Sequence, residues 1–297
     1  MSKECYIVEK STGEIINEDF VVDELKDIQR KKEMVEKNKL SQKFKELEDE
    51  YLGNFVFYVF KNIDKLETIL NDNYLVKFLY CCSYVKKNGT LMLDNNITYI
   101  NRKKLKGLLK IGDKTFNKFY RILKDNELIK EQDNKIYINI NICWRGSKKE
   151  HETIINGKFK DFTRLYIKTI RELYENTPLR HHKQISIVYK LIPYTNWQYN
   201  ILCTIDTVEE IDKNKIKPLR INDIMDILKY NKTHITRFKK NFYSLKYNEY
   251  NIFGTVQFES DFLKSFIIVN PVFFYRGNDP DNLNYLITLF GLSKINK

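Results

Sequence analysis

Apolar residues recur with helical spacing in two similar stretches of the chain. In residues 109–123, LKIGDKTFNKFYRIL, the side chains of Phe116, Phe119 and Leu123 fall on one stripe of a helix. Residues 228–242, LKYNKTHITRFKKNF, align with this stretch without a gap at an offset of 119 residues. The aligned apolar positions are occupied by Ile235, Phe238 and Phe242. Each stretch therefore predicts an amphipathic helix with its apolar side toward a core, which in the first stretch also includes Tyr120.

A second pair of similar segments follows the two helices. Residues 136–146, IYININICWRG, and residues 266–277, FIIVNPVFFYRG, are both rich in β-branched and aromatic residues, and each ends in aromatic-Arg-Gly. Both carry an asparagine, Asn139 or Asn270. Upstream, apolar helical stretches occur at residues 73–87 and 183–198. The order helix, helix, turn, helix, strand, turn, strand is thus present twice, which indicates an internal duplication.

This order of elements is typical of a winged helix. Asn101 is expected to cap a helix that runs to Lys110, Gly112 to adopt a left-handed turn conformation, and Asp113 to cap the next helix. Residues 128–132 and 135–140 predict a hairpin around the turn Asp133-Asn134. In the second half the corresponding hairpin, residues 250–270, is longer.

The segments outside these repeats complete the predicted organisation. Residues 23–51 form a highly charged helix that is either a solvated arm or an oligomerisation helix of a homodimer, and residues 55–60, FVFYVF, predict a strand or the buried start of the first domain. Residues 159–176 place Phe162, Tyr166, Ile170 and Leu173 on one stripe and predict a connecting helix. The expected fold is α+β, mainly α, with two tandem winged helix-turn-helix domains joined by a helix. The expected boundaries are 1–50 for an N-terminal strand and charged helical arm, 51–150 for the first domain, 151–180 for the connecting helix and 181–297 for the second domain.

Positive charge is concentrated in the two predicted helix-turn-helix segments. The chain of 297 residues has a formal net charge of +12, although residues 1–50 carry a net charge of −4. Residues 101–124 have a net charge of +8, and residues 229–246 have a net charge of +6 with no acidic side chain. Solvated helices usually mix both signs, so two clusters of a single sign indicate a polyanionic partner. Double-stranded DNA is the partner that suits a winged helix.

The polar sides of the two helices supply the candidate DNA contacts. In the first half these are Lys114, Thr115, Asn117, Lys118, Arg121 and Lys124, with Lys103 on the preceding helix and Lys135 near the tip of the hairpin. We expect Asn117 and Lys118 to contact base edges, because amide and ammonium groups pair with adenine and guanine in the major groove. Lys124 and Lys103 are expected to contact phosphate. In the second half the equivalent residues are Lys232, Thr233, His234, Thr236, Arg237 and Lys240.

Motifs for catalysis, metal binding and membrane insertion are weak or absent. The stretch GLLKIGDKT (107–115) resembles a phosphate-binding loop, but Asp113 separates Gly112 from Lys114 and would repel phosphate. Four histidines and five cysteines without metal-ligand spacing argue against a zinc site, and the cysteines predict reduced, mostly buried thiols. No apolar stretch is long enough to span a membrane. We expect a cytoplasmic protein that is not an enzyme and binds no cofactor or metal.

Three segments also carry a family resemblance: YIVEKSTGEII (6–16), TRLYIKTIRELYEN (163–176) and the paired endings ICWRG and FFYRG. With these the chain resembles tandem winged-helix proteins of phages and plasmids of low-GC Gram-positive bacteria, and its architecture is similar to iteron-binding plasmid replication initiators. The resemblance implies binding to origin repeats and recruitment of replisome proteins, without ATPase or nickase activity. The sequence leaves two alternatives open: a transcriptional regulator that binds an operator, and an interaction adaptor that binds no DNA.

Overall fold

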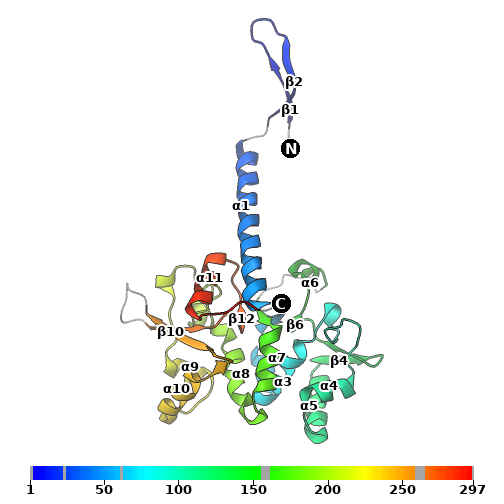
Figure 1. The fold of residues 1–297 in the computed structure, drawn as a ribbon, viewed down its shortest axis with the longest axis vertical. Helices are drawn as coiled ribbons and strands as arrows, with labels where there is room; N and C mark the ends of the chain where they lie inside the picture. The colour runs from blue at the N-terminus through cyan, green and yellow to red at the C-terminus, as the bar shows by residue number, and fades with distance from the viewer. Residues whose placement is uncertain (1–2, 23–24, 61–62, 155–160, 258–264, 296–297) are drawn as a thin grey trace. The chain divides into compact units, whose positions relative to one another are not determined.

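The computed structural model describes residues 3–22, 25–60, 63–154, 161–257 and 265–295 (Figure 1). Tertiary contacts divide the chain into two compact units, residues 1–46 and residues 47–297. The described residues form a mainly helical α+β protein with small antiparallel sheets, as the sequence predicts.

The first unit contains a hairpin and most of a long charged helix. Strands β1 (Lys3–Val8) and β2 (Ile15–Val22) pair antiparallel, and helix α1 (Leu25–Leu47) follows them. The few apolar side chains of α1 include Met34, Val35 and Leu40, each more than half exposed. A π-helical turn at Glu48–Leu52 continues α1, so the helix predicted within residues 23–51 is confirmed from residue 25 onwards, whereas its role in oligomerisation stays a prediction.

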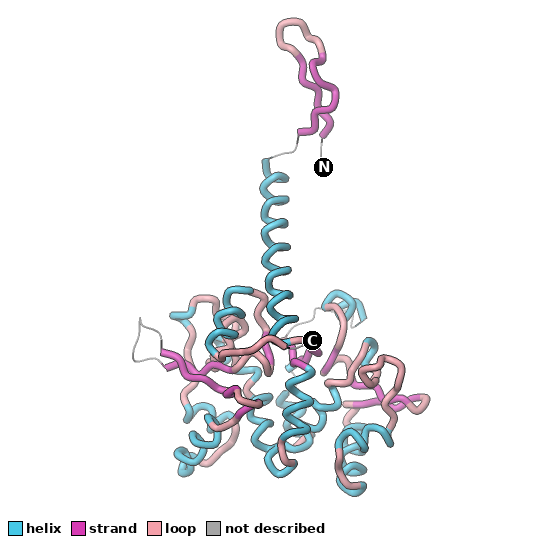
Figure 2. The backbone as a smooth tube through the Cα atoms, in the orientation of Figure 1, coloured by secondary structure: helices cyan, strands magenta, loops and turns pink. Residues whose placement is uncertain are grey.

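Residues 47–297 are organised around a four-stranded antiparallel sheet that takes strands from both halves of the sequence. Figure 2 distinguishes the strands, in magenta, from the helices, in cyan. The strand order is β12-β7-β3-β6. The bounds are β3 (Phe55–Val59), β6 (Cys143–Trp144), β7 (Phe162–Tyr166) and β12 (Phe274–Tyr275). The predicted strand at residues 55–60 is confirmed, and the two aromatic-Arg-Gly segments supply the two edge strands of the same sheet.

The register of this sheet relates the two halves of the chain by a twofold rotation. At its centre, Phe57 of β3 lies opposite Arg164 of β7. Phe57 also lies opposite Trp144 of the edge strand β6, and Arg164 lies opposite Tyr275 of the other edge strand, β12. Exchanging β3 with β7 and β6 with β12 therefore reproduces the pairing, so the duplication expected from the sequence is present in the tertiary structure.

Both halves place four helices and then a hairpin between their central and edge strands, and the second half has an additional short hairpin, β8–β9. In the first half these are α2 (Ile63–Ile69), α3 (Asp72–Cys82), α4 (Arg102–Leu109), α5 (Asp113–Asp125), β4 (Ile129–Gln132) and β5 (Lys135–Ile138), with α6 (Lys148–Ile154) after the edge strand. In the second half they are α7 (Ile167–Asn176), α8 (His182–Lys190), α9 (Ile221–Ile227), α10 (Ile235–Tyr243), β8 (Lys246–Tyr247), β9 (Tyr250–Asn251), β10 (Phe253–Gln257) and β11 (Ser265–Val269), with α11 (Pro280–Leu289) after the edge strand.

Both faces of the sheet are covered, and on one of them Phe57, Val59 and Trp144 form a buried hydrophobic cluster. Alternate residues of the two central strands, including Val56, Tyr58 and Leu165, are fully buried because successive side chains of a strand point to opposite faces. Helices α3 and α8 pack against each other, and most of their side chains are buried. This explains why both helices read as nearly continuous apolar stretches in the sequence.

Four of the five cysteines are buried free thiols, as predicted: Cys81, Cys82, Cys143 and Cys203. Burial raises the pKa of Cys81 to about 12 and that of Cys203 to about 11. The neutral thiols behave as small apolar side chains in this core. The side chain of Cys5 lies outside the described residues.

The helix predicted for residues 159–176 is wrong in its first part. Residues Phe162–Tyr166 form the central strand β7, and helix α7 begins only at Ile167. The spacing of Phe162 and Tyr166 fits a helical stripe, but β7 pairs with a neighbour on each side. Those neighbours lie about a hundred residues away in the sequence, so a local pattern could not reveal them. Residues 155–160 of the predicted connection lie outside the described residues.

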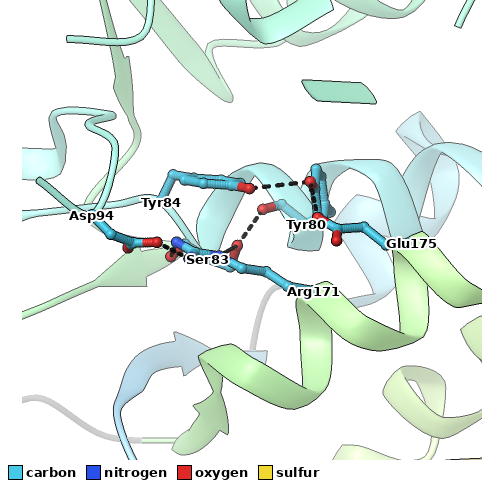
Figure 3. Close-up of polar contacts among 6 residues, drawn as sticks. All are labelled: Tyr80, Ser83, Tyr84, Asp94, Arg171 and Glu175. Atoms are coloured by element: carbon cyan, nitrogen blue, oxygen red, sulfur yellow. Dashed lines mark hydrogen bonds and ion pairs between the residues drawn. The ribbon is translucent and has the colours of Figure 1, made fainter. Parts of the chain in front are cut away.

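A side chain of α7 joins the second half to the end of α3 in the first half (Figure 3). The guanidinium of Arg171 donates from Nε to the Ser83 hydroxyl at 3.0 Å and from Nη2 to the Ser83 carbonyl at 2.9 Å. Its Nη1 donates to Asp94 at 2.5 Å. Nearby, the Tyr80 hydroxyl donates to Glu175 of α7 at 2.7 Å. These contacts satisfy a carbonyl at the C-terminal end of α3 and limit relative motion of the two halves.

Candidate nucleic-acid interface

Helices α4 and α5 form a compact pair joined by a short turn. The side chain of Asn101 accepts a hydrogen bond from the Lys104 backbone N–H at 3.0 Å and caps α4, as predicted. Leu105 and Leu109 of α4 are buried. The turn residue that adopts a left-handed conformation is Lys110, with φ of 51° and ψ of 40°.

The predicted roles of Gly112 and Asp113 in this turn are therefore wrong. Gly112 has φ of −67° and ψ of 157°, and it precedes α5 as its N-cap, while Asp113 is the first helical residue. The reason is that α4 ends earlier than expected: the Lys110 N–H bonds back to the carbonyls of Lys106 and Gly107, which requires the reversal at position 110. Asp113 forms an ion pair with Lys106 across the turn, and its charge is favourable at a helix N-terminus.

Helix α5 has one buried side and one polar side, as predicted. Phe116, Phe119, Tyr120 and Leu123 are all buried. The opposite positions are all exposed: Lys114, Thr115, Asn117, Lys118, Arg121 and Lys124. Among the residues that the structure describes, Lys114, Lys118 and Arg121 form no ion pair. One cavity is lined by Arg102 and by seven residues of α5, namely Lys114, Asn117, Lys118, Tyr120, Arg121, Lys124 and Asp125. Five of the predicted contact residues of the first half, Lys114, Asn117, Lys118, Arg121 and Lys124, therefore line one surface, whereas Lys103, Thr115 and Lys135 do not line it.

Arg102, the first residue of α4, belongs to this surface but was not among the predicted contacts. Its Nη2 donates to Asn117 Oδ1 at 2.9 Å, and its guanidinium lies 5.0 Å from the centroid of the Tyr120 ring. The Asn117 amide retains its two N–H donors and one carbonyl lone pair. Arg102 thus orients Asn117 while leaving it able to pair with a base edge. Its position in the strongly basic window of residues 101–124 is the sequence signal that could have drawn attention to it.

The hairpin of the first half is tied to α5 by a polar contact. The Tyr120 hydroxyl donates to Glu131 of β4 at 2.8 Å, and the Lys124 ammonium lies 3.6 Å from the same carboxylate. Burial raises the pKa of Tyr120, so the hydroxyl remains a donor. Lys124, expected to contact phosphate, is therefore partly neutralised by Glu131.

The predicted hairpin around Asp133-Asn134 is confirmed. Both turn residues have positive φ, 50° and 57°, which is the conformation of the tight turns that match strand twist. Lys135 follows the turn directly, and its ammonium lies 4.0 Å from the centroid of the Tyr99 ring. Lys103 is exposed on α4. Lys135, in contrast, is half-buried.

In the second half, a 3-10 turn at Lys232–His234 precedes helix α10. Thr233 and His234 consequently lie in this turn and not in the helix that their alignment suggests. The predicted contact residues are all exposed: Lys232, Thr233, His234, Thr236, Arg237 and Lys240. Lys232 forms an ion pair with Asp226 at 2.7 Å. Within the described ranges, Arg237 and Lys240 form none.

Helix α10 has a buried side opposite its exposed contact residues, as α5 has in the first half. Phe238 and Phe242 are buried, whereas Ile235 is only half-buried. Phe242 stacks on Phe253 of β10 with ring centroids 3.9 Å apart. Strands β10 and β11 pair as a hairpin whose connection, residues 258–264, lies outside the described residues.

The asparagines shared by the two closing segments have the same structural role. Asn139 Nδ2 donates to the Glu127 carbonyl, and Asn270 Nδ2 donates to the Asn251 carbonyl, both at 3.1 Å. Each side-chain oxygen also accepts a backbone N–H two residues further along the chain. These residues hold each hairpin to the following segment, so their recurrence reflects folding and not ligand recognition.

The described residues contain no group of three or more side chains suited to a metal ion. None of the described helices combines the length and the apolar character needed to cross a membrane. Comparison of the chain with protein-family models, with curated proteins and with solved structures gave no match. The two exposed basic helices are therefore the feature of the molecule that points to a function.

Proposed function

We propose that each half of residues 47–297 is a winged-helix domain, and that the protein binds double-stranded DNA in a sequence-specific manner. The observation that carries this proposal is the matched pair of helices α5 and α10. Each buries an aromatic side and exposes cations that have no ion pair among the described residues, namely Lys118 and Arg121 on α5 and Arg237 and Lys240 on α10. Because DNA binding would not require any of these cations to give up an ion pair within the described residues, their contacts with phosphate or guanine would cost little free energy.

The twofold relation of the halves determines what kind of site one chain would recognise. Recognition helices related by a twofold axis contact half-sites of opposite orientation, separated by about 10 base pairs when they enter successive major grooves. The aligned contact residues differ, with Asn117 opposite Thr236 and Lys118 opposite Arg237. One chain would therefore recognise two inverted half-sites that are similar but not identical.

Within this class, we favour a replication initiator of a mobile element, with origin DNA and replisome proteins as partners. The support is the resemblance of the tandem architecture to iteron-binding initiators. The rival is a transcriptional regulator with the same DNA-binding surface. Several copies of the composite site in one origin would support initiation, whereas a single copy over a promoter would support regulation.

Footprinting with the full chain on the DNA of its own element tests the proposal. We expect protection of two adjacent major-groove segments on one face of the duplex, lost when Lys118 and Arg237 are both replaced by alanine. Absence of protection, together with no salt-dependent affinity for any duplex, would contradict DNA binding. The remaining alternative would then be an interaction adaptor that binds no DNA.

A further inference from the structure

A cavity beside α10 in the second half has a composition that DNA binding does not require. Its volume is about 300 Å³, and it lies between α8 and α10. Buried apolar side chains of Ile187, Phe238 and Phe242 line its interior. Contacts to DNA phosphates use exposed cations, so DNA binding does not account for the apolar interior of this cavity.

The exposed rim of this cavity is basic. Arg180, Lys183 and Arg237 line it, together with His234, and no carboxylate is among its lining residues. In the described part of the chain, neither Lys183 nor Arg237 forms an ion pair, and the Arg180 Nε donates to the neighbouring His181 ring at 3.1 Å. Small-molecule sites typically combine an apolar interior of this size with a few polar groups that fix orientation.

The first half provides an internal comparison, because a larger side chain stands at the equivalent helix position there. Tyr74 is the third residue of α3, and Gln184 is the third residue of α8, the equivalent helix. The Tyr74 ring is buried against Phe119 of α5, with ring centroids 5.3 Å apart. Phe119 aligns with Phe238, and the smaller, half-buried Gln184 stands at the position of Tyr74 and helps to line the cavity. In the second half the ring of Tyr230 packs on Phe238, with ring centroids 5.0 Å apart, and also lines the cavity.

We propose that this cavity binds a small organic anion whose aromatic body packs on Ile187, Phe238 and Phe242 and whose carboxylate or phosphate head contacts Arg180, Lys183 and Arg237. An aromatic body fits because the rings of Tyr230, Phe238 and Phe242 line the cavity and aromatic rings pack favourably on one another. The ligand would also contact Arg237 and so reduce DNA binding by the second half, a consequence that rests on the proposed function. Binding of the anion to the cavity does not depend on DNA binding by the protein.

Methyl NMR titration of the full chain tests the binding. The probes are phenyl phosphate and benzoate, which separate the two head groups, and the neutral benzyl alcohol is the matched control. We expect saturable shifts of the Ile187 and Leu245 methyl signals with at least one anion, much weaker binding of benzyl alcohol, and no shift at Leu109 in the first half. Failure of both anions to shift Ile187, or equal binding of benzyl alcohol, would overturn the proposal.

Two substitutions locate the site. Gln184→Tyr, which restores the aromatic ring of the first half, should abolish binding. Lys183→Gln at an exposed rim position should weaken the anion by roughly tenfold, the loss of one charge-assisted contact. The exposed Lys239→Gln, outside the cavity lining, is the charge-matched control and should leave binding unchanged. Equal effects of the two lysine substitutions would contradict the site. If the chain binds an anion but no DNA, the proposed function fails while the cavity assignment stands.

Discussion

Lys110 and Lys229 are equivalent residues, 119 positions apart, that both adopt the left-handed backbone conformation. Lys110 follows the end of α4 and Lys229 follows the end of α9, the helices that precede α5 and α10. Their φ angles are 51° and 58°. Each N–H closes its helix by bonding back to a carbonyl three residues earlier, Gly107 or Asp226. The duplication thus extends to the backbone conformation of single residues, and in both copies a lysine occupies a position usually taken by glycine.

The conformation of this turn can be tested by stability. Lys110→Gly should raise the free energy of unfolding by up to about 1 kcal/mol, because glycine adopts the left-handed region without the penalty of other residues. Gly112→Ser should raise it by a few tenths of a kcal/mol, because serine is a good N-cap at the observed backbone angles. Urea denaturation measures both. A clear destabilisation by Gly112→Ser would instead favour the left-handed glycine predicted from the sequence.

Replacement of Lys118 or Arg237 by alanine should weaken specific DNA binding by about 1 to 3 kcal/mol and relax the preference at one base position if that side chain reads a base. The physical reason is the loss of a charged donor to a base edge. Electrophoretic mobility shifts with a library of altered sites give both quantities. Lys37→Ala, an exposed lysine of α1, should have no effect on specificity, and a uniform loss across all sites would assign Lys118 to phosphate contact.

The number of basic helices that engage DNA can be read from the salt dependence. With roughly 6 to 10 phosphates contacted by both halves, the logarithm of affinity should fall with the logarithm of salt concentration at a slope of roughly −5 to −9. Removing the exposed cations of α10 should reduce this slope to about half. A wild-type slope near about −1 would show that the two halves do not bind together.

Arg171→Ala should lower the free energy of unfolding by about 2 to 3 kcal/mol, because it leaves the Ser83 carbonyl without its charged donor. Asp94 contributes little to this loss, since its side chain is 68% exposed. Urea denaturation provides the measurement. The comparison is Lys168→Ala on the same helix, whose ion pair with Glu172 is exposed and should be worth less than about 0.5 kcal/mol. Equal effects would contradict a special role of Arg171 in joining the halves.

Acid should destabilise the protein through His182. Burial lowers the pKa of this side chain below its ordinary value of 6.5. Its Nε2 donates to the Tyr174 and Thr177 carbonyls, Nδ1 is buried without a partner among the described residues, and the ammonium of Lys77 disfavours a second positive charge. The folded protein therefore binds this proton less readily than the unfolded chain.

The expected result is a fall in unfolding free energy as pH decreases below 6.5, with a limiting slope of about 1.4 kcal/mol per pH unit from this group. His182→Gln cannot titrate and should remove this part of the pH dependence, even though it lowers the stability itself. Denaturant midpoints measured between neutral and mildly acidic pH compare the two proteins. Parallel profiles of wild type and variant would contradict the assignment to His182.

Local patterns determined much of the candidate interface. The spacing of Phe116, Phe119 and Leu123 depends only on helix geometry, so the buried side of α5 and its exposed basic side could both be derived from the sequence. The hairpin around Asp133-Asn134 likewise follows from the conformational preferences of two adjacent residues.

Tertiary structure alone decided how the two repeats combine. The residues of strand β7 show helical spacing of apolar side chains and were predicted as a helix. They form a strand because they pair with β3 and β12, which are distant in the sequence. The contact of Arg102 with Asn117 and the open space beside Gln184 depend on how neighbouring helices pack. The sequence by itself therefore determined the repeated elements and their buried faces, which periodicity encodes. The twofold arrangement and the side chains that meet across it depend on long-range pairing, which no local pattern records.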